Sequence, residues 1–227
     1  MYDLYIADLN TLTDDRFALL FERMPQERRE KINRCKMTAD KRRSLGAGAL
    51  LEYARKHFGI NGKTELAYTE LDKPYFPDLP NVHFNLSHSG DMVMCIIATN
   101  EVGCDIEQIS EKANMEIARR FFFCDEYLAL QNTKSREEQL DVFFSLWTLK
   151  ESFIKCVGAG LSLPLDSFCI SKGKKITVVQ DTYKGDFAFC EVDVPGNYKC
   201  SYCIKDYYGG FISQKYIDFG NIVDSIC

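Results

Sequence analysis

The sequence predicts an α+β fold built from mixed helices and largely antiparallel strands. Long stretches carry apolar residues at helical spacing, others alternate apolar and polar residues as strands do, and turn signals join neighbouring strands into hairpins. At 227 residues the chain is long enough for one large domain or two small ones with a core. A boundary near Val102 or Gly103 would divide it into comparable parts, 1–102 and 103–227.

The expected elements follow from periodicity and from punctuating residues. Gly59 ends the second expected helix, and prolines stiffen an extended loop at 73–80. We expect helices at 13–36, 39–58, 115–123, 125–130 and 137–158. We expect strands at 2–9, 66–69, 82–86, 92–98, 102–107, 168–171, 175–180, 186–192, 198–204 and 211–217.

The chain is acidic overall but contains one strongly basic segment. Its formal net charge of −5 argues against a general nucleic-acid binder. Between Gln26 and Arg43, eight residues are basic and three are acidic, which suits a small, multiply charged anion; the alternative is a solvated helix face. The basic residues are Arg28, Arg29, Lys31, Arg34, Lys36, Lys41, Arg42 and Arg43.

The ten cysteines are typical of small buried apolar residues in a reducing compartment, here the cytoplasm. They are scattered and mostly flanked by apolar residues, and the N-terminal residues show no secretory signal. Cys200 and Cys203 form a lone Cys-x-x-Cys pair without a second pair at zinc spacing. No apolar run approaches the roughly 18 residues of a membrane span, so we expect no membrane partner.

The segment Gly103–Glu107 places two carboxylates on one side of an expected strand. Asp105 and Glu107 are two residues apart and point to the same face, whereas Cys104 and Ile106 point to the other. Two converging carboxylates are costly without a cation. Ligation by oxygen alone suits Mg²⁺ or Mn²⁺; the alternative is an exposed strand end with solvated acids.

The helix expected at 137–158 carries a third carboxylate, Glu151, at the edge of an apolar face that includes Trp147 and Ile154. A carboxylate beside apolar residues is partly desolvated and needs a cation or donors. That cation is either Lys155, one turn further on, or a metal that Glu151 shares with the strand carboxylates. The adjacent Lys150 and Lys155 would offset phosphate charge during a transfer reaction.

The run Phe84–Gly90 reads as a strand that enters a loop of small residues able to meet an anion. Ser87 and His88 are adjacent there, but adjacent side chains of an extended segment point apart and no Gly-x-Ser-x-Gly elbow is present, so a serine hydrolase is not indicated. With the carboxylates and the basic segment, this loop indicates an enzyme acting on a pyrophosphate-containing nucleotide.

At these residues the sequence resembles the Sfp-type (surfactin-type) 4′-phosphopantetheinyl transferases. The resemblance is carried by Gly103-Cys104-Asp105-Ile106-Glu107 and by Trp147-Thr148-Leu149-Lys150-Glu151-Ser152-Phe153-Ile154-Lys155. The runs Phe84–Ser89, Lys73-Pro74 and 160–166 also resemble the corresponding segments of family members, and the similarity extends from about residue 25 to residue 170. Cys104 stands where isoleucine or valine is expected, but it faces away from the carboxylates.

The resemblance implies a reaction and a fold. Coenzyme A, the co-substrate, binds with Mg²⁺ on its pyrophosphate; the serine of an apo acyl or peptidyl carrier protein attacks the β-phosphorus; and 3′,5′-ADP leaves. The implied fold is a monomer made of a pseudo-twofold pair of similar α+β subdomains. The N-terminal one lies on the nucleotide side, and the C-terminal one carries the metal carboxylates.

The resemblance also implies residue roles. Asp105, Glu107 and Glu151 map onto the metal ligands, and Glu151 is also a candidate base for the carrier serine, directly or through water. Lys155 maps onto a catalytic lysine that contacts the phosphates. Contacts to coenzyme A are expected from Arg28, Lys31, Arg43, Lys73, Ser87, His88, Lys150 and Lys155.

Two other classes remain open at this point: a non-catalytic protein that binds coenzyme A or a carrier, and a Mg²⁺-dependent nucleotide hydrolase. The carrier's pathway also stays open among fatty-acid, polyketide and nonribosomal-peptide synthesis. Carrier contacts are expected near 115–130, through Arg119 and Arg120 and through Phe121–Phe123, unless those phenylalanines belong to the core.

Overall fold

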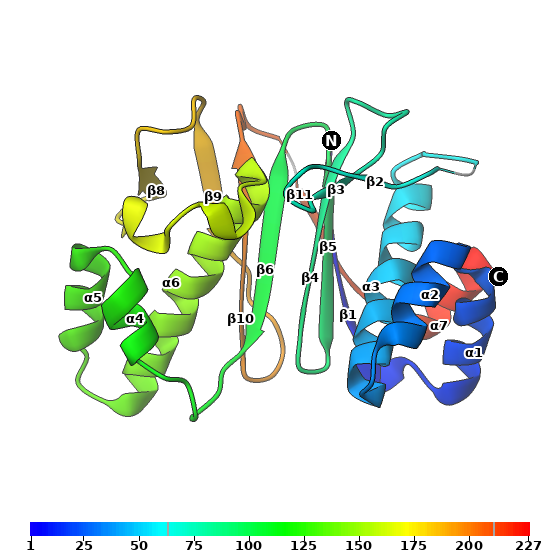
Figure 1. Ribbon diagram of the computed structural model, residues 1–227, viewed down its shortest axis with the longest axis horizontal. Coiled ribbons are helices and arrows are strands. Elements are labelled where there is room, and N and C mark those ends of the chain that lie inside the picture. The colour runs from blue at the N-terminus through cyan, green and yellow to red at the C-terminus, as the bar shows by residue number, and fades with distance from the viewer. Residues whose placement is uncertain (63, 211) are drawn as a thin grey trace.

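The computed structural model describes residues 1–62, 64–210 and 212–227. It confirms the predicted α+β class: two sheets lie against each other at the centre, and helices cover their outer faces (Figure 1). Each sheet has one long helix against it, α3 (Thr38–His57) on one side and α6 (Arg136–Val157) on the other. This repeated arrangement is consistent with a pseudo-twofold pair of α+β units.

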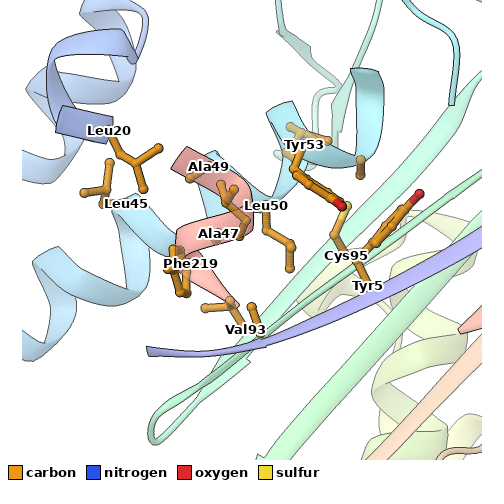
Figure 2. Close-up of a cluster of buried hydrophobic side chains, with 14 of the residues drawn as sticks. Tyr5, Leu20, Leu45, Ala47, Ala49, Leu50, Tyr53, Val93, Cys95 and Phe219 are labelled. Atoms are coloured by element: carbon orange, nitrogen blue, oxygen red, sulfur yellow. The ribbon is translucent and has the colours of Figure 1, made fainter. Parts of the chain in front are cut away.

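The first sheet is built from both ends of the chain. Its strands are ordered β11 (Ile212–Ile217), β1 (Tyr2–Asp8), β5 (Met92–Ala98) and β4 (His83–Ser89). Side chains of β5 alternate between two cores, as the period of a strand requires. Val93 and Cys95 pack toward α3 (Figure 2), whereas Met94 and Ile96 pack against the second sheet.

The second sheet consists of β6 (Val102–Gln108), β10 (Tyr198–Lys205) and β9 (Phe187–Glu191), in that order. Helix α6 begins where the Ser135 side chain accepts a hydrogen bond from the Glu138 N–H, and it ends at Gly158, whose φ of 71° is the left-handed conformation common at helix ends. Helices α4 (Glu116–Phe121) and α5 (Cys124–Gln131) lie beyond α6 (Figure 1).

Most of the predicted elements are confirmed, with one division. The helix predicted at 13–36 is two helices, α1 (Asp14–Arg23) and α2 (Gln26–Arg34), because Pro25 between them has no N–H to donate and a fixed φ. The smaller strands are β2 (Ala67–Tyr68), β3 (Pro74–Tyr75), β7 (Cys169–Lys172) and β8 (Ile176–Val179).

The C-terminal segment corrects the predicted division of the chain at residue 102. Strand β11 pairs in parallel with β1, and α7 (Phe219–Ile226) packs onto the core under α3. Residues 212–226 therefore belong with the N-terminal part. Helix α7 itself was not predicted, although Asp218 caps it through the Gly220 N–H and its apolar residues have helical spacing.

All ten cysteines are free thiols, and most are buried, as the sequence predicts. Within the described ranges, none of the helices combines the length and the apolar character needed to cross a membrane.

Candidate active site

Three carboxylates meet where α6 packs on β6. Asp105 and Glu107 lie on β6, and Glu151 lies on α6. Asp105 is buried, and the other two are half-buried. The pKa values of Glu107 and Glu151 are both raised, first by burial and then by the negative charge of Asp105. The carboxylates are thus close enough to repel one another, as the strand period and the helix position predict.

The close packing of α6 on β6 depends on Gly103. A Cβ atom at this position would lie 2.1 Å from the Ser152 carbonyl oxygen and 2.3 Å from the Cys156 nitrogen, both in the backbone of α6. Any side chain would therefore push the helix away from the strand. The glycine of the Gly-x-Asp-x-Glu motif is what allows Glu151 and Lys155 to approach Asp105.

Lys155 pairs with Asp105. Its Nζ lies 2.6 Å from Asp105 Oδ1 and donates to Ser87 Oγ over 3.1 Å. Burial alone would lower the pKa of Lys155, but the charge of Asp105 and the hydrogen bond to it raise the pKa overall. The sequence left open an ion pair between Glu151 and Lys155 within one helix. Lys155 instead forms its ion pair with Asp105, which joins α6 to β6.

Ser87, His88 and Ser89 are not in a loop, contrary to the sequence prediction. They are the last residues of β4, and the turn follows at Gly90, where φ is 55°. Ser87 Oγ donates to Asp105 Oδ1 over 2.8 Å, and Ser89 Oγ donates to Glu107 Oε2 over 2.7 Å. Both hydroxyls are therefore engaged with the carboxylates.

The residues around Asp105 fit a divalent cation. Among the described residues, no three His, Cys, Asp or Glu side chains already form a ligand set as they lie. Asp105 Oδ2, however, is buried, and none of these described residues forms a hydrogen bond with it. A buried carboxylate oxygen without a partner costs free energy, and a hard cation with oxygen ligands would satisfy it.

Several predicted coenzyme A residues gather beside the carboxylates. His88 is exposed, and its pKa is lowered by partial desolvation of its ring and by the positive charges of Arg43, Lys155 and Lys31 nearby. Arg43 donates to the Gly90 carbonyl over 3.1 Å and pairs with Asp40. The structure thus brings residues of α2, α3, β4 and α6 into one positively charged zone.

Arg28, one turn before Lys31 on α2, lies against α3. A Cβ atom at Gly48 would lie 3.2 Å from Arg28 Nε, so the guanidinium stem packs directly on the α3 backbone. Arg28 and Lys31 both line a hollow of about 620 Å³ between α2, α3 and residues 64–68. Lys31 is therefore shared between the hollow and the zone around His88.

Lys150 points away from the carboxylates, which contradicts the expectation that it contacts coenzyme A. It is fully buried, pairs with Glu126 at 2.7 Å and donates to the Phe168 carbonyl over 2.8 Å. Its ammonium also lies 4.2 Å from the centre of the Phe168 ring. Lys150 therefore anchors α6 to α5 and to the strand that follows.

Lys73 is also engaged with the protein itself. Its Nζ donates to the Cys156 carbonyl at the end of α6 over 2.7 Å and to the Val102 carbonyl at the start of β6 over 3.4 Å. Burial lowers its pKa. Its side chain crosses Gly158 so closely that a Cβ atom there would lie 3.0 Å from Lys73 Cδ. The ammonium is thus engaged within the protein, while the residue also lines the cavity that Glu151 and Lys155 line; a contact of Lys73 with the nucleotide stays a prediction.

We expect Lys73→Met to destabilise the protein and to leave its affinity for coenzyme A nearly unchanged. The substitution leaves the Cys156 carbonyl, in the last turn of α6, without this donor, at a cost of about 1–3 kcal/mol. Urea unfolding and direct titration with coenzyme A measure the two effects separately. A large loss of affinity at unchanged stability would restore the nucleotide contact.

A cavity of about 820 Å³ opens beside the carboxylates, between the two sheets' helices and loops. Glu151 and Lys155 of α6 line it together with the polar residues Asp72, Lys73 and Asn85, and Trp147 and Ile154 continue along the same face of α6, as the helical spacing predicts. The rest is mostly apolar and comes from Leu71, Pro74, Ile117, Phe121, Leu161, Leu163 and Leu165. The site thus combines a charged end with a long apolar wall.

Sequence reasoning missed three residues of this region: Asn85, Ser89 and Glu126. Ser89 is two residues from Ser87, so a predicted strand that continued to Ser89 would have placed both serines on the same face. Glu126 gave no signal, because a glutamate in a short helix is ordinarily solvated.

Comparison with known proteins shows the family to which the chain belongs. Residues 101–203 match the 4′-phosphopantetheinyl transferase superfamily, and residues 11–101 match the N-terminal domain described as 4′-phosphopantetheinyl transferase, N-terminal. The transferase gsp of Aneurinibacillus migulanus is 36% identical over 203 residues, 88% of this chain and 84% of the relative. The chain therefore belongs to the 4′-phosphopantetheinyl transferase family.

Within the family, the chain is similar to the Sfp type, as the motifs predict. The 4′-phosphopantetheinyl transferase Sfp of Bacillus subtilis (strain 168) is 42% identical over 146 residues, which cover 63% of this chain and 64% of that protein. A second 4′-phosphopantetheinyl transferase of Bacillus subtilis matches at the same identity over the same shares. The alignment thus spans a little under two thirds of the length of these two relatives.

Proposed function

We propose that this chain transfers 4′-phosphopantetheine from coenzyme A to a serine of an apo acyl or peptidyl carrier protein, with Mg²⁺, and releases 3′,5′-ADP. The observation that carries the proposal is the position of the Asp105, Glu107 and Glu151 carboxylates. Glu151 and Lys155 line a large, mostly apolar cavity, Lys155 pairs with Asp105, and the basic residues around His88 lie nearby. A pyrophosphate with an apolar arm attached matches that combination.

In the proposed reaction, the oxygen of the carrier serine forms a bond to the β-phosphorus of coenzyme A. The bond from this phosphorus to the bridging oxygen breaks, and that oxygen leaves with 3′,5′-ADP. The serine proton passes to Glu151, directly or through water; the raised pKa of Glu151 makes its carboxylate a stronger base than an exposed glutamate. Lys155, freed from part of its pairing with Asp105, offsets negative charge on the phosphates.

The metal ligands would be Asp105, Glu107 and Glu151. The bound Mg²⁺ would supply charge neutralisation at the pyrophosphate. Lys31, Arg43 and His88, whose positive charges and ring lie near one another, would bind the remaining phosphate of coenzyme A. The apolar wall along Trp147 and Ile154 is suited to the pantetheine arm or to the carrier segment that bears the serine.

We further propose that the carrier docks over α4. Phe121 lines the cavity and is 49% exposed, and Arg119 and Arg120 are exposed on the same helix, where they can meet acidic residues. Phe122 is buried against Phe143 and belongs to the core, so only part of the predicted aromatic contact is available. The site lies within a single chain, which suits a monomer, and the buried free thiols suit the cytoplasm.

The test is incubation of the protein with coenzyme A, Mg²⁺ and a panel of purified apo carriers from fatty-acid, polyketide and nonribosomal-peptide synthesis. We expect at least one carrier to gain the mass of one phosphopantetheine group, with release of an equal amount of 3′,5′-ADP. Binding of coenzyme A without release would indicate a non-catalytic binding protein. Cleavage of coenzyme A without any carrier would indicate a hydrolase. Either result contradicts the transferase.

A further inference from the structure

The two sheets meet along β4 and β6, which lie next to each other at the centre of the molecule (Figure 1). The strands belong to different sheets, and β6 forms its backbone ladder with β10 on its other side. In a strand, successive N–H groups point to opposite sides, so every second N–H of β6 faces β4. These donors need partners other than a strand carbonyl, most of all those of Cys104 and Ile106, which are buried.

Three side chains of β4 supply those partners at a spacing of two residues. Asn85 Oδ1 accepts from the Cys104 N–H over 2.9 Å, and Ser87 Oγ accepts from the Ile106 N–H over 3.3 Å. The third side chain, Ser89, accepts through Oγ from the Gln108 N–H over 3.1 Å. The row Asn85–Ser87–Ser89 therefore replaces a backbone ladder between the two sheets.

These acceptor contacts determine where the hydroxyl protons go. A serine hydroxyl has one proton to donate and two lone pairs to accept with. In Ser87 the lone pairs face the Ile106 N–H and Lys155 Nζ, so the proton points to Asp105. In Ser89 one lone pair faces the Gln108 N–H and the proton points to Glu107. Each serine thus fixes one carboxylate relative to the strand that carries it.

We propose that Ser89 and Ser87 are positioning residues, which orient Glu107 and Asp105 for a divalent cation, and that Asn85 continues the same row. The proposal rests on the proposed function, in which these carboxylates hold the metal. It gives Ser87 a role toward its carboxylate rather than toward the nucleotide. Groups that hydrogen-bond metal ligands typically change metal affinity or activity by about 10–100-fold when removed.

Ser89 is the better residue to test, because it is half-buried, whereas Ser87 is buried and also contacts Lys155. The informative variants are Ser89→Ala, which removes the hydroxyl, and Ser89→Thr, which keeps it. Ser110→Ala is the matched control, because Ser110 is exposed and its hydroxyl only accepts from the nearby Lys112 N–H. Ser89→Cys, which keeps the size and a weak donor, serves if the alanine variant does not fold.

The measurement is Mn²⁺ binding in the presence of coenzyme A, followed by the loss of the free-ion electron paramagnetic resonance signal. We expect Ser89→Ala to weaken Mn²⁺ binding by about tenfold or more, Ser89→Cys to weaken it less, and Ser89→Thr to stay near the wild type. The affinity for coenzyme A without metal and the thermal unfolding midpoint should change little. Ser110→Ala should behave as the wild type does in all three measurements.

Wild-type Mn²⁺ affinity in a folded Ser89→Ala variant would overturn the positioning role and leave the metal assignment intact. An equal loss of Mn²⁺ affinity in Ser89→Ala and Ser89→Thr would also overturn it, because the hydroxyl would then not be the cause. If the wild-type protein itself binds no Mn²⁺, the metal assignment fails and the positioning role fails with it. The wild-type titration therefore separates the two failures.

Discussion

Glu151→Gln is expected to lower kcat/KM for transfer to a carrier by about 10²–10⁴-fold, the range that loss of a general base produces. The substitution keeps the size of the side chain and removes its negative charge, so both the proton acceptor and a metal ligand are lost. Because burial and the charge of Asp105 raise the pKa of Glu151 in the protein without metal, protons compete with the metal for this carboxylate, and activity of the wild type should fall with decreasing pH before an exposed glutamate would protonate. Initial rates of 3′,5′-ADP release across pH measure both effects.

The matched control for this prediction is Glu137→Gln. Glu137 is exposed in the first turn of the same helix, several turns before Glu151. Both variants should unfold near the wild-type temperature, since relief of repulsion at Glu151 offsets the lost contacts there. A Glu151→Gln variant with near-native turnover would refute the assignment of Glu151 as base and ligand.

Lys150→Met is expected to produce the largest loss of stability of any single substitution considered, about 3–5 kcal/mol. Removing one partner of a buried ion pair leaves the other charge buried without compensation. Here the stranded partner is Glu126, which also accepts hydrogen bonds from the Phe123 and Ile170 N–H groups. Urea unfolding measures the loss, and the exposed Lys174→Met is the control for removal of a lysine.

The same variant decides whether Lys150 contacts coenzyme A. If its role is to anchor α6, the KM for coenzyme A should remain near the wild-type value below the unfolding transition. Full stability combined with a strongly raised KM would show instead that Lys150 reaches the phosphates. This outcome would contradict the buried pair with Glu126.

The helix and strand that carry the carboxylates could be predicted because their periodicity is strong and local. The prediction of a helix at 137–158 differs by one residue at each end from Arg136–Val157. The strand period also placed Asp105 and Glu107 on one face, where Ser87 and Ser89 contact them. These parts of the site depend only on residues that are close in sequence.

The roles of the lysines could not be predicted in the same way. Helix α6 is buried around most of its circumference, so adjacent residues such as Lys150 and Glu151 enter different environments, and the sequence does not say which side faces the site. The end of β4 was predicted as a loop because the environment of its serines also depends on tertiary packing. Its serines are typical of a loop in water, but at the junction of two sheets they take the place of strand carbonyls.

The pairing of β11 with β1 has a consequence for how the chain is made. The second sheet and its helix come from one continuous stretch, whereas the first sheet needs residues separated by more than 200 positions along the chain. During synthesis, β1 keeps an open edge until residues 212–217 have left the ribosome. The half that carries α6 can therefore fold early, while the half that carries the basic segment between Gln26 and Arg43 is completed last.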